Sequence, residues 1–215
     1  MFEAILRTQW KATRAMVLLT TILAFGLPLA SLQGARDASS AQQFVITMQA
    51  WGGGYSVLAA LLGLLVALAA WRPDHVGQHV YALSLPIPRS RYALFRFGAG
   101  AAFLAPTVVA LLLGALVVTF SGAVPEGLHG YPLALTLRFA FAAMVAYALF
   151  FAIASSTSKT AGTIIGVMVG LVFAQYLLSV VADTNTNILE PIVNFLLYRP
   201  GVLSVFAGRW MLIDV

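Results

Sequence analysis

Long apolar runs separated by short polar segments dominate the pattern of this chain. Five intervals carry no charged residue: 15–35, 38–71, 97–125, 139–158 and 160–182. A helix needs about 20 predominantly apolar residues, each adding about 1.5 Å, to cross the hydrocarbon core of a bilayer. Each interval is long enough for one such helix. The sequence therefore predicts an all-α polytopic membrane protein, a helix bundle of five spans in a single transmembrane domain over residues 1–215.

The spans can be placed within these intervals. We expect them near residues 15–32, 53–71, 97–120, 133–154 and 161–182. The first half of the second interval is polar and ends in glycines 52–54, so it is expected to be an exposed loop or a short surface helix. Pro28 and Pro106 fall inside two spans and predict kinks or helix ends. Residues 183–215 are expected to be extracytoplasmic, with a sixth span either marginal or missing.

Composition agrees with a membrane protein. Hydrophobic residues make up 61% and charged residues 9% of the 215 residues, and the mean hydropathy is +0.94. So few charges cannot cover a soluble globule, because soluble domains contain about 25% charged residues. A soluble enzyme, a disordered chain and a nucleic-acid-binding protein are therefore excluded. The chain has no Cys, which removes disulfides and thiol chemistry and leaves the redox compartment open.

Basic residues are distributed unequally between the two sides of the predicted membrane. One side carries eight of them: Arg7, Lys11, Arg14, Arg72, Arg89, Arg91, Arg96 and Lys159. The other side carries fewer, accompanied by acids: Arg36, Arg138, Asp37, Glu126 and Asp183. Lys and Arg collect on the cytoplasmic side, so we expect a multi-pass protein of the cell (inner) membrane with a cytoplasmic N-terminus. A cleaved signal peptide is the alternative for the first run, but no suitable cleavage site follows Ala30.

Residues 1–14 have the periodicity of an amphipathic helix. Phe2, Leu6 and Trp10 repeat every four positions, whereas the cations of this segment fall on another face. Such a helix lies in the membrane interface with its cations towards anionic lipid. A basic leader that only sets the topology explains the same pattern, and both interpretations keep the segment cytoplasmic.

The connection between the second and third spans is the most informative segment. Pro73 and Asp74 suit the first turn of a helix, and Pro86 with Pro88 prevents that helix from continuing. The pattern therefore predicts a short cytoplasmic helix over residues 73–85. Its apolar positions exceed those of a solvated loop and are typical of a docking element: Val76, Val80, Tyr81 and Leu83.

Two histidines of this connection are spaced like a metal-binding pair. His75 and His79 stand at positions i and i+4 of the predicted helix. A zinc site needs further ligands, but no Glu follows His75 in the manner of a metalloprotease and no third ligand is evident. We therefore expect no metal or cofactor site in this chain.

The order of these features resembles the permease subunit of a type-2 ATP-binding cassette (ABC-2) transporter. That family has a cytoplasmic amphipathic helix before the first span, and a coupling helix between spans two and three that is followed by Leu-Ser-x-Pro-x-x-Arg. Residues 83–89 read Leu-Ser-Leu-Pro-Ile-Pro-Arg, followed by Ser-Arg-Tyr. The family usually has a Glu in the coupling helix, where this chain offers Asp74, Gln78 and His79, and it usually has six spans.

The resemblance implies a function and two partners. A permease subunit of this kind is no enzyme and moves its substrate, here unidentified, with ATP that a separate cytoplasmic subunit binds with Mg and hydrolyses. The resemblance implies that this ATPase contacts the coupling helix and the residue after it: Asp74, His75, Val76, His79, Val80, Tyr81 and Arg89. It also implies a second permease chain, in a homodimer or a heterodimer.

The fifth predicted span carries a small residue at every fourth position. Gly162, Gly166 and Gly170 are followed by Ala174 at the same spacing. Such a stripe lets the backbone of another helix approach closely. Packing within the subunit and contact between two permease chains both explain it. Gln175 lies deep in the same span, where it either contacts substrate or makes a hydrogen bond between helices.

Motifs that the sequence lacks argue against several functional classes. The sequence has no Gly-x-x-x-x-Gly-Lys-[Ser/Thr] loop, so the chain is not expected to bind ATP in that way. The spans hold no Asp, Glu, Lys, Arg or His apart from Arg138 near an end, whereas an ion-coupled transporter keeps such groups near the midplane. Ser155, Ser156 and Ser158 have no neighbouring His or acid, which disfavours a membrane hydrolase. A structural or assembly subunit of a larger membrane complex is the alternative to the permease.

Overall fold

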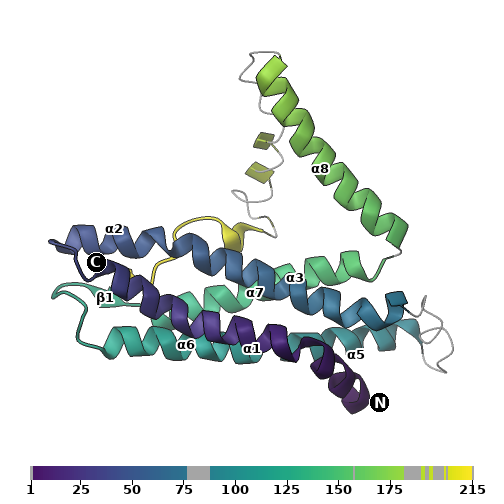
Figure 1. Ribbon diagram of the computed structural model, residues 1–215, viewed down its shortest axis with the longest axis horizontal. Coiled ribbons are helices and arrows are strands. Elements are labelled where there is room, and N and C mark those ends of the chain that lie inside the picture. The colour runs from purple at the N-terminus through teal and green to yellow at the C-terminus, as the bar shows by residue number, and fades with distance from the viewer. Residues whose placement is uncertain are drawn as a thin grey trace. The chain divides into compact units, whose positions relative to one another are not determined.

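The computed structural model describes most of the chain and divides it into two compact units (Figure 1). The described residues are 2–76, 88–156, 158–181, 190–191, 194–195, 201 and 203–214. The first unit comprises residues 1–151 together with 208–215, and the second comprises residues 152–207. Long helices make up most of both units, so the predicted helical fold class is confirmed in its coarse form.

Four helical segments of the first unit are long and apolar enough to cross a membrane. They are Phe2–Ala35, Ala41–Arg72, Arg89–Phe120 and Pro132–Ala154, and the first four predicted spans fall within them. Large apolar side chains cover their outer surface, as the exposed fractions of Ile22 (68%), Phe120 (81%) and Phe141 (64%) show. Such a surface suits lipid and would be unfavourable in water.

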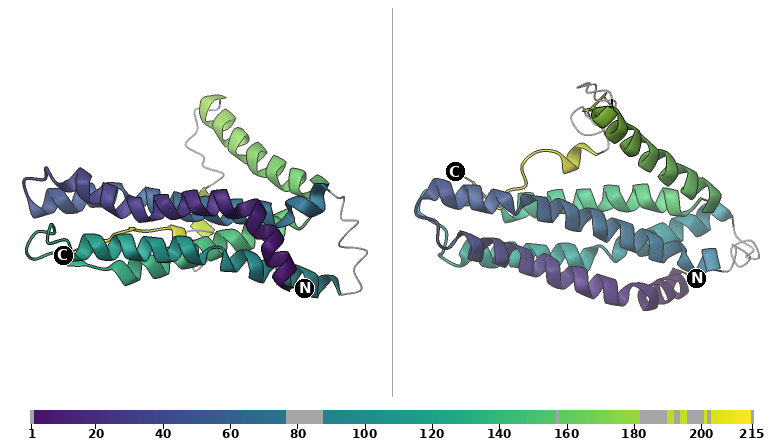
Figure 2. Two further views of the ribbon diagram at one scale, coloured as in Figure 1. Left: turned by 60° about the horizontal axis from the view of Figure 1, so that its bottom comes forward. Right: turned by 45° about the horizontal axis from the view of Figure 1, so that its top comes forward.

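The first helix, α1 (Phe2–Ala35), is continuous over 34 residues. The expected boundary between an interfacial helix over residues 1–14 and the first span is therefore not a helix end. Figure 2 shows instead that the N-terminal turns bend away from the rest of α1. Pro28 lies inside α1 and does not end the helix.

Aromatic contacts hold the N-terminal turns of α1 against α5 (Arg89–Ala102). Phe2 packs edge-on against Phe95 with ring centroids 6.2 Å apart, and Trp10 packs against Phe103 at 5.7 Å. The cations of these turns are exposed: Arg7, Lys11 and Arg14. The predicted separation of aromatic and basic faces is therefore present.

The second charge-free interval contains two helices, α2 (Ala41–Ala50) and α3 (Gly52–Val76), and the span predicted at residues 53–71 lies within α3. The Ser40 side chain accepts a hydrogen bond from the amide of Gln43 at 3.2 Å and caps α2. A short helix before the span was one of two expectations for this segment. It is not purely a surface helix, because the side chain of Phe44 is only 4% exposed.

The third predicted span is divided between α5 and α6 (Ala105–Phe120). The break falls at residues 103–104, directly before Pro106. Proline has no N–H to donate to the carbonyl of Ala102, so the helix is interrupted there. The predicted helix end at Pro106 is confirmed.

Two glycines bring helices of the first unit into close contact. A Cβ atom at Gly114 of α6 would lie 2.5 Å from the carbonyl oxygen of Phe25 in α1. A Cβ atom at Gly63 of α3 would lie 2.5 Å from the amide nitrogen of Tyr147 in α7 (Pro132–Ala154). Both crossings need glycine, because any side chain would push the helices apart.

The chain returns to the first unit at its C-terminal end. β2 (Ile213–Asp214) pairs antiparallel with β1 (His129–Gly130), and His129 stands opposite Asp214. The side chain of Leu212 is 2% exposed, so this segment is part of the core of the first unit. A short 3₁₀ helix, Ser204–Phe206, precedes it in the chain.

The second unit contains α8 (Ser158–Val181), which begins three residues before the predicted fifth span and ends one residue before its expected end. Residues 162–175 form its apolar stretch. Large side chains on α8 are exposed, among them Val169 (62%) and Phe173 (59%). The helix that the sequence predicted is present, and its described apolar side chains are not buried within the second unit.

Candidate functional site

A buried arginine joins α3 to α5 at one end of the first unit. The guanidinium carbon of Arg96 lies 5.4 Å from the ring centroid of Trp71 and 4.9 Å from that of Tyr92. Its Nη1 donates a hydrogen bond to the carbonyl oxygen of Ala70, and the residue is only 6% exposed. We call Arg96, Trp71 and Tyr92 the Arg96 clamp.

The Arg96 clamp lies where α3 continues beyond its predicted end at residue 71. Pro73 was expected to begin a separate helix, but α3 runs through it to Val76. Proline weakens the hydrogen bonding of the preceding turn, because it lacks an N–H and its ring clashes with the carbonyl four residues earlier. Arg96 donates to the Ala70 carbonyl, which neighbours the Ala69 carbonyl that Pro73 leaves without a helical donor. A side chain from another helix thus stabilises a turn that proline would weaken.

An aromatic layer supports the clamp from α7. Phe151 lies 5.2 Å from Trp71 between ring centroids, and the Phe97 and Tyr147 rings stack at 5.0 Å. The hydroxyl of Tyr147 donates to the carbonyl of Phe97 at 3.0 Å. Gly100 makes this approach feasible, because a Cβ atom there would clash with the Tyr147 hydroxyl. The ends of α3, α5 and α7 therefore meet in one packed layer.

Along the sequence, the predicted ATPase contacts run from the last residues of α3 to the first residue of α5, the two helices that the clamp joins. Asp74, His75 and Val76 form the last residues of α3, and only their backbone is described. His79, Val80 and Tyr81, with the rest of residues 77–87, lie outside the described residues. Arg89 is the first residue of α5 and is exposed. The predicted docking helix over residues 73–85 stays a prediction.

This end of the first unit is strongly basic. Its exposed cations are Arg7, Lys11, Arg14, Arg72, Arg89 and Arg91. Two of them, Arg89 and Arg91, occupy the first turn of α5, which contains no acidic residue. Cations are unfavourable at a helix N-terminus, by about 0.3–1 kcal/mol each, because the helix dipole is positive there. Their position favours a role outside the helix, with anionic lipid or an acidic partner.

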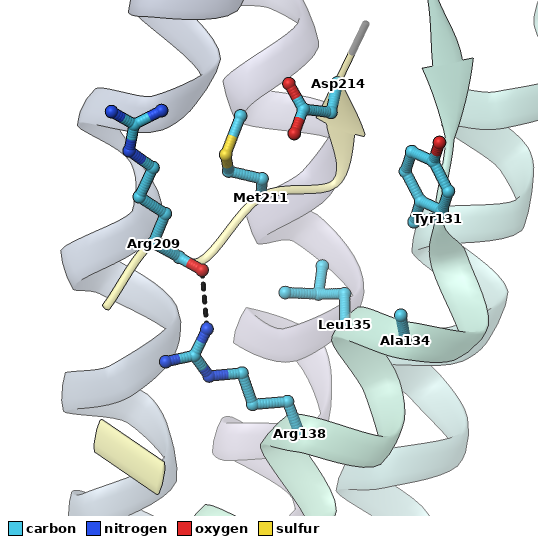
Figure 3. Close-up of a pocket in the computed structure, with 7 residues that line it drawn as sticks. All are labelled: Tyr131, Ala134, Leu135, Arg138, Arg209, Met211 and Asp214. Atoms are coloured by element: carbon cyan, nitrogen blue, oxygen red, sulfur yellow. Dashed lines mark hydrogen bonds between the residues drawn. The ribbon is translucent and has the colours of Figure 1, made fainter. Parts of the chain in front are cut away.

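A second arginine connects α7 to the C-terminal segment at the opposite end of the unit. The guanidinium carbon of Arg138 lies 4.7 Å from the ring centroid of Trp210, and its Nη1 donates to the carbonyl of Arg209 at 2.5 Å (Figure 3). We call Arg138 and Trp210 the Arg138 clamp. A Cβ atom at Gly52 would lie 2.9 Å from the carbonyl oxygen of Trp210, so α3 also touches this segment.

A cavity of about 420 Å³ lies beside the Arg138 clamp. Its lining combines two cations, one acid and apolar side chains: Tyr131, Ala134, Leu135, Arg138, Arg209, Met211 and Asp214. In Figure 3 the side chain of Met211 lies between those of Arg209 and Asp214. Sequence reasoning noted Arg138 only as a basic residue near a helix end and did not identify this site.

The glycine stripe of α8 is exposed within the described part of the chain. Gly162, Gly166 and Gly170 all lie on the surface, and a Cβ atom at any of them would meet no described heavy atom within 4 Å. Within the second unit, the described residues provide no close neighbour for the stripe.

No protein-family model, curated protein or solved structure matches this chain.

Proposed function

We propose that the chain is the transmembrane permease subunit of an ABC-2 type transporter, driven by ATP that a separate cytoplasmic subunit hydrolyses. The observation that carries the proposal is the Leu-Ser-Leu-Pro-Ile-Pro-Arg sequence of residues 83–89, which leads directly into α5 at the basic end. The ATPase would dock on residues 73–85 and leave Arg89 at the rim of the contact.

The Arg96 clamp supports this proposal because it joins the two helices that flank the docking segment. A push on residues 77–87 would reach α3 and α5 together, since Arg96 binds the Ala70 carbonyl and stacks on Trp71. Phe151 extends the same layer to α7. A connection anchored in this way can transmit movement into the spans, whereas a loose loop would absorb it.

Two positions in the first unit, the C-terminal end of α7 and residues 208–214, support a count of five membrane spans. α7 runs from β1 to the layer around Trp71, so Phe151 lies at the Arg96 end. Residues 208–214 lie at the opposite end, where Trp210 meets Gly52 and Leu212 accepts a hydrogen bond from Tyr131 at 2.8 Å. In this proposal the two positions face opposite sides of the membrane, so residues 152–207 cross it an odd number of times.

α8 is the helix suited to that crossing. Its 24 residues extend about 36 Å, which exceeds the hydrocarbon thickness of about 30 Å. The basic end of the unit is then cytoplasmic, as the distribution of Lys and Arg predicts, and residues 208–214 are extracytoplasmic. The N-terminus lies in the cytoplasm of a cell (inner) membrane protein.

Pairing of two permease chains completes the proposal. Five helices are too few to enclose a broad pathway, and the exposed stripe of Gly162, Gly166 and Gly170 offers a surface for close contact with a second chain. Cys pairs introduced along the stripe should crosslink two chains in native membranes. Absence of these crosslinks in an active transporter would assign the stripe to internal packing.

The docking assignment can be tested by disrupting the apolar positions of residues 73–85. The tagged chain is purified from membranes of its source cell, and the preparation is assayed for a stoichiometric ATPase and for ATP hydrolysis. Val80→Asp with Tyr81→Asp should abolish both, because two carboxylates cannot be desolvated in an apolar contact. The matched control is Ser121→Asp with Ala123→Asp, which changes two exposed residues of the connection after α6.

Retention of the ATPase by the Val80/Tyr81 variant would contradict docking on this segment. Absence of any ATPase from the wild-type complex would contradict the permease itself and leave the structural or assembly subunit as the alternative. Equal yields of both variants in the membrane fraction confirm that insertion is unaffected.

A further inference from the structure

The cavity beside the Arg138 clamp has features of a ligand site that the proposed permease function does not use. Its volume of about 420 Å³ falls within the range of about 300–1,000 Å³ that small-molecule pockets occupy. It lies between the first two turns of α7 and the C-terminal segment, and both belong to the first unit.

The charges of the lining specify the ligand. Arg138 and Arg209 provide two guanidinium groups, each with five N–H donors in a planar fork suited to phosphate. Asp214 places a carboxylate on the same wall. Asp214 disfavours an anionic group on its side of the cavity, and the arginines disfavour a cationic group on theirs. A ligand that carries both an anion and a cation complements all three.

Contacts within the structure hold one of the arginines in place. The Arg138 guanidinium is oriented by the Trp210 ring and by the Arg209 carbonyl. The Arg209 side chain is exposed and has no hydrogen-bond or ion-pair partner among the described residues. One cation is thus fixed in advance, while the other is available to an incoming anion.

The apolar part of the lining indicates an amphiphilic ligand. Leu135 and Met211 line the cavity together with the charged groups. On the same turns of α7, Leu133 and Leu137 are 64% and 59% exposed, and this apolar surface continues to Phe141. The cavity therefore opens where a membrane-spanning helix begins, at the level of lipid headgroups.

From these observations we propose that the cavity binds a head that combines a phosphate with a primary ammonium, as in phosphatidylethanolamine. The phosphate contacts Arg209, the ammonium contacts Asp214 on the other side of Met211 (Figure 3), and the chains lie along Leu133 and Leu137. The same head occurs in soluble glycerophosphoethanolamine, so the test has to separate a lipid from a free head. The site is independent of the ATPase and would exist in either of the two functional classes.

Native mass spectrometry of the delipidated full-length chain tests the site. The chain is titrated with phosphatidylethanolamine, phosphatidylglycerol and soluble glycerophosphoethanolamine. We expect phosphatidylethanolamine to bind about fivefold more tightly than phosphatidylglycerol, because a partly exposed ion pair contributes up to about 1 kcal/mol. Binding of the soluble head with equal affinity would assign the site to a free zwitterion, and its failure to bind would assign the site to lipid.

Two variants with matched controls locate the binding. Asp214→Asn should remove the preference for phosphatidylethanolamine and leave phosphatidylglycerol binding at least as strong, whereas Arg209→Gln should weaken both about fivefold. Asp37→Asn and Arg36→Gln change exposed charges in the α1–α2 connection and should alter neither affinity. An absent preference in the wild type, or equal effects of the variants and their controls, would overturn the proposal. Unchanged thermal unfolding of Asp214→Asn shows that the fold is retained.

Discussion

The two ends of the first unit use the same contact in different surroundings. In each, an arginine of a membrane-spanning helix stacks on a tryptophan and donates to the carbonyl of the residue that precedes it, Ala70 for Arg96 and Arg209 for Arg138. The distances to the ring centroids are similar, 5.4 Å from Trp71 and 4.7 Å from Trp210. The arginine–tryptophan pair therefore fastens a polypeptide segment to the bundle at both ends.

The surroundings of the two clamps differ. Arg96 is 6% exposed, stacks on a second ring from Tyr92 and is covered by the aromatic layer of α7. Arg138 is half-buried and borders a cavity. The Arg96 clamp is closely packed at its end of the bundle, whereas the Arg138 clamp has open space beside it. Burial around the contact, more than the contact itself, distinguishes the two clamps.

The largest effect is expected from Arg96→Ala. The substitution removes a charge-assisted hydrogen bond and two ring contacts from a buried site, so the free energy of unfolding should fall by about 3 kcal/mol. Denaturant unfolding in micelles, followed by tryptophan fluorescence, measures this loss. Arg89→Ala, at an exposed position of the same helix, should change stability by less than about 0.5 kcal/mol. Equal effects at the two positions would remove the distinction between a clamp and a surface arginine.

Arg138→Ala should have a smaller and more local effect. The half-buried site loses one ring contact and one hydrogen bond, which together stabilise by about 1–2 kcal/mol. Hydrogen exchange should accelerate at residues 209–214 while the amides of α3 remain protected. Loss of protection throughout the unit would show that the two clamps are equivalent and would contradict the comparison.

Gly52→Ala should disturb the Arg138 end by the smallest amount. The added methyl group would lie 2.9 Å from the Trp210 carbonyl, so the C-terminal segment has to shift, at a cost of about 1 kcal/mol. Gly53→Ala is the control, because nothing lies within 4 Å of a Cβ atom there. That variant should be neutral or slightly more stable, since Ala favours a helix over Gly. Thermal unfolding of the pair measures the difference, and a loss of stability in the control alone would contradict this packing.

The main helices were predictable because hydropathy and charge are local properties of the sequence. The span expected at residues 133–154 matches α7 within one residue, and the break before Pro106 follows from the chemistry of proline. The passage of α3 through Pro73 was not predictable in this way, nor was the contact of Arg96 with the adjoining turn, because it joins two different helices. The spacing of Tyr92 and Arg96, at i and i+4, was the available signal for the clamp.

The Arg138 end was harder to predict because its contacts join distant parts of the chain. Arg138 binds a carbonyl 71 residues away, and β1 and β2 are too short to show an alternating pattern. The sequence indicates that a charged Arg138 is energetically unfavourable inside a span, but it does not indicate which segment its side chain contacts. The cavity depends on that pairing and was therefore missed.

Cysteine labelling tests the central claim, that five spans place the Arg96 end in the cytoplasm, most directly. The chain has no native Cys, so single cysteines at Ser39, Ser90, Ser155 and Ser204 give a clean signal with a membrane-impermeant maleimide. We predict labelling of Ser39→Cys and Ser204→Cys in intact cells, and labelling of Ser90→Cys and Ser155→Cys only after permeabilisation. Labelling of Ser204→Cys only after permeabilisation, with Ser39→Cys still labelled from outside, would contradict the crossing by α8. A reversed pattern at all four positions would contradict the cytoplasmic location of the Arg96 end and the docking of an ATPase there.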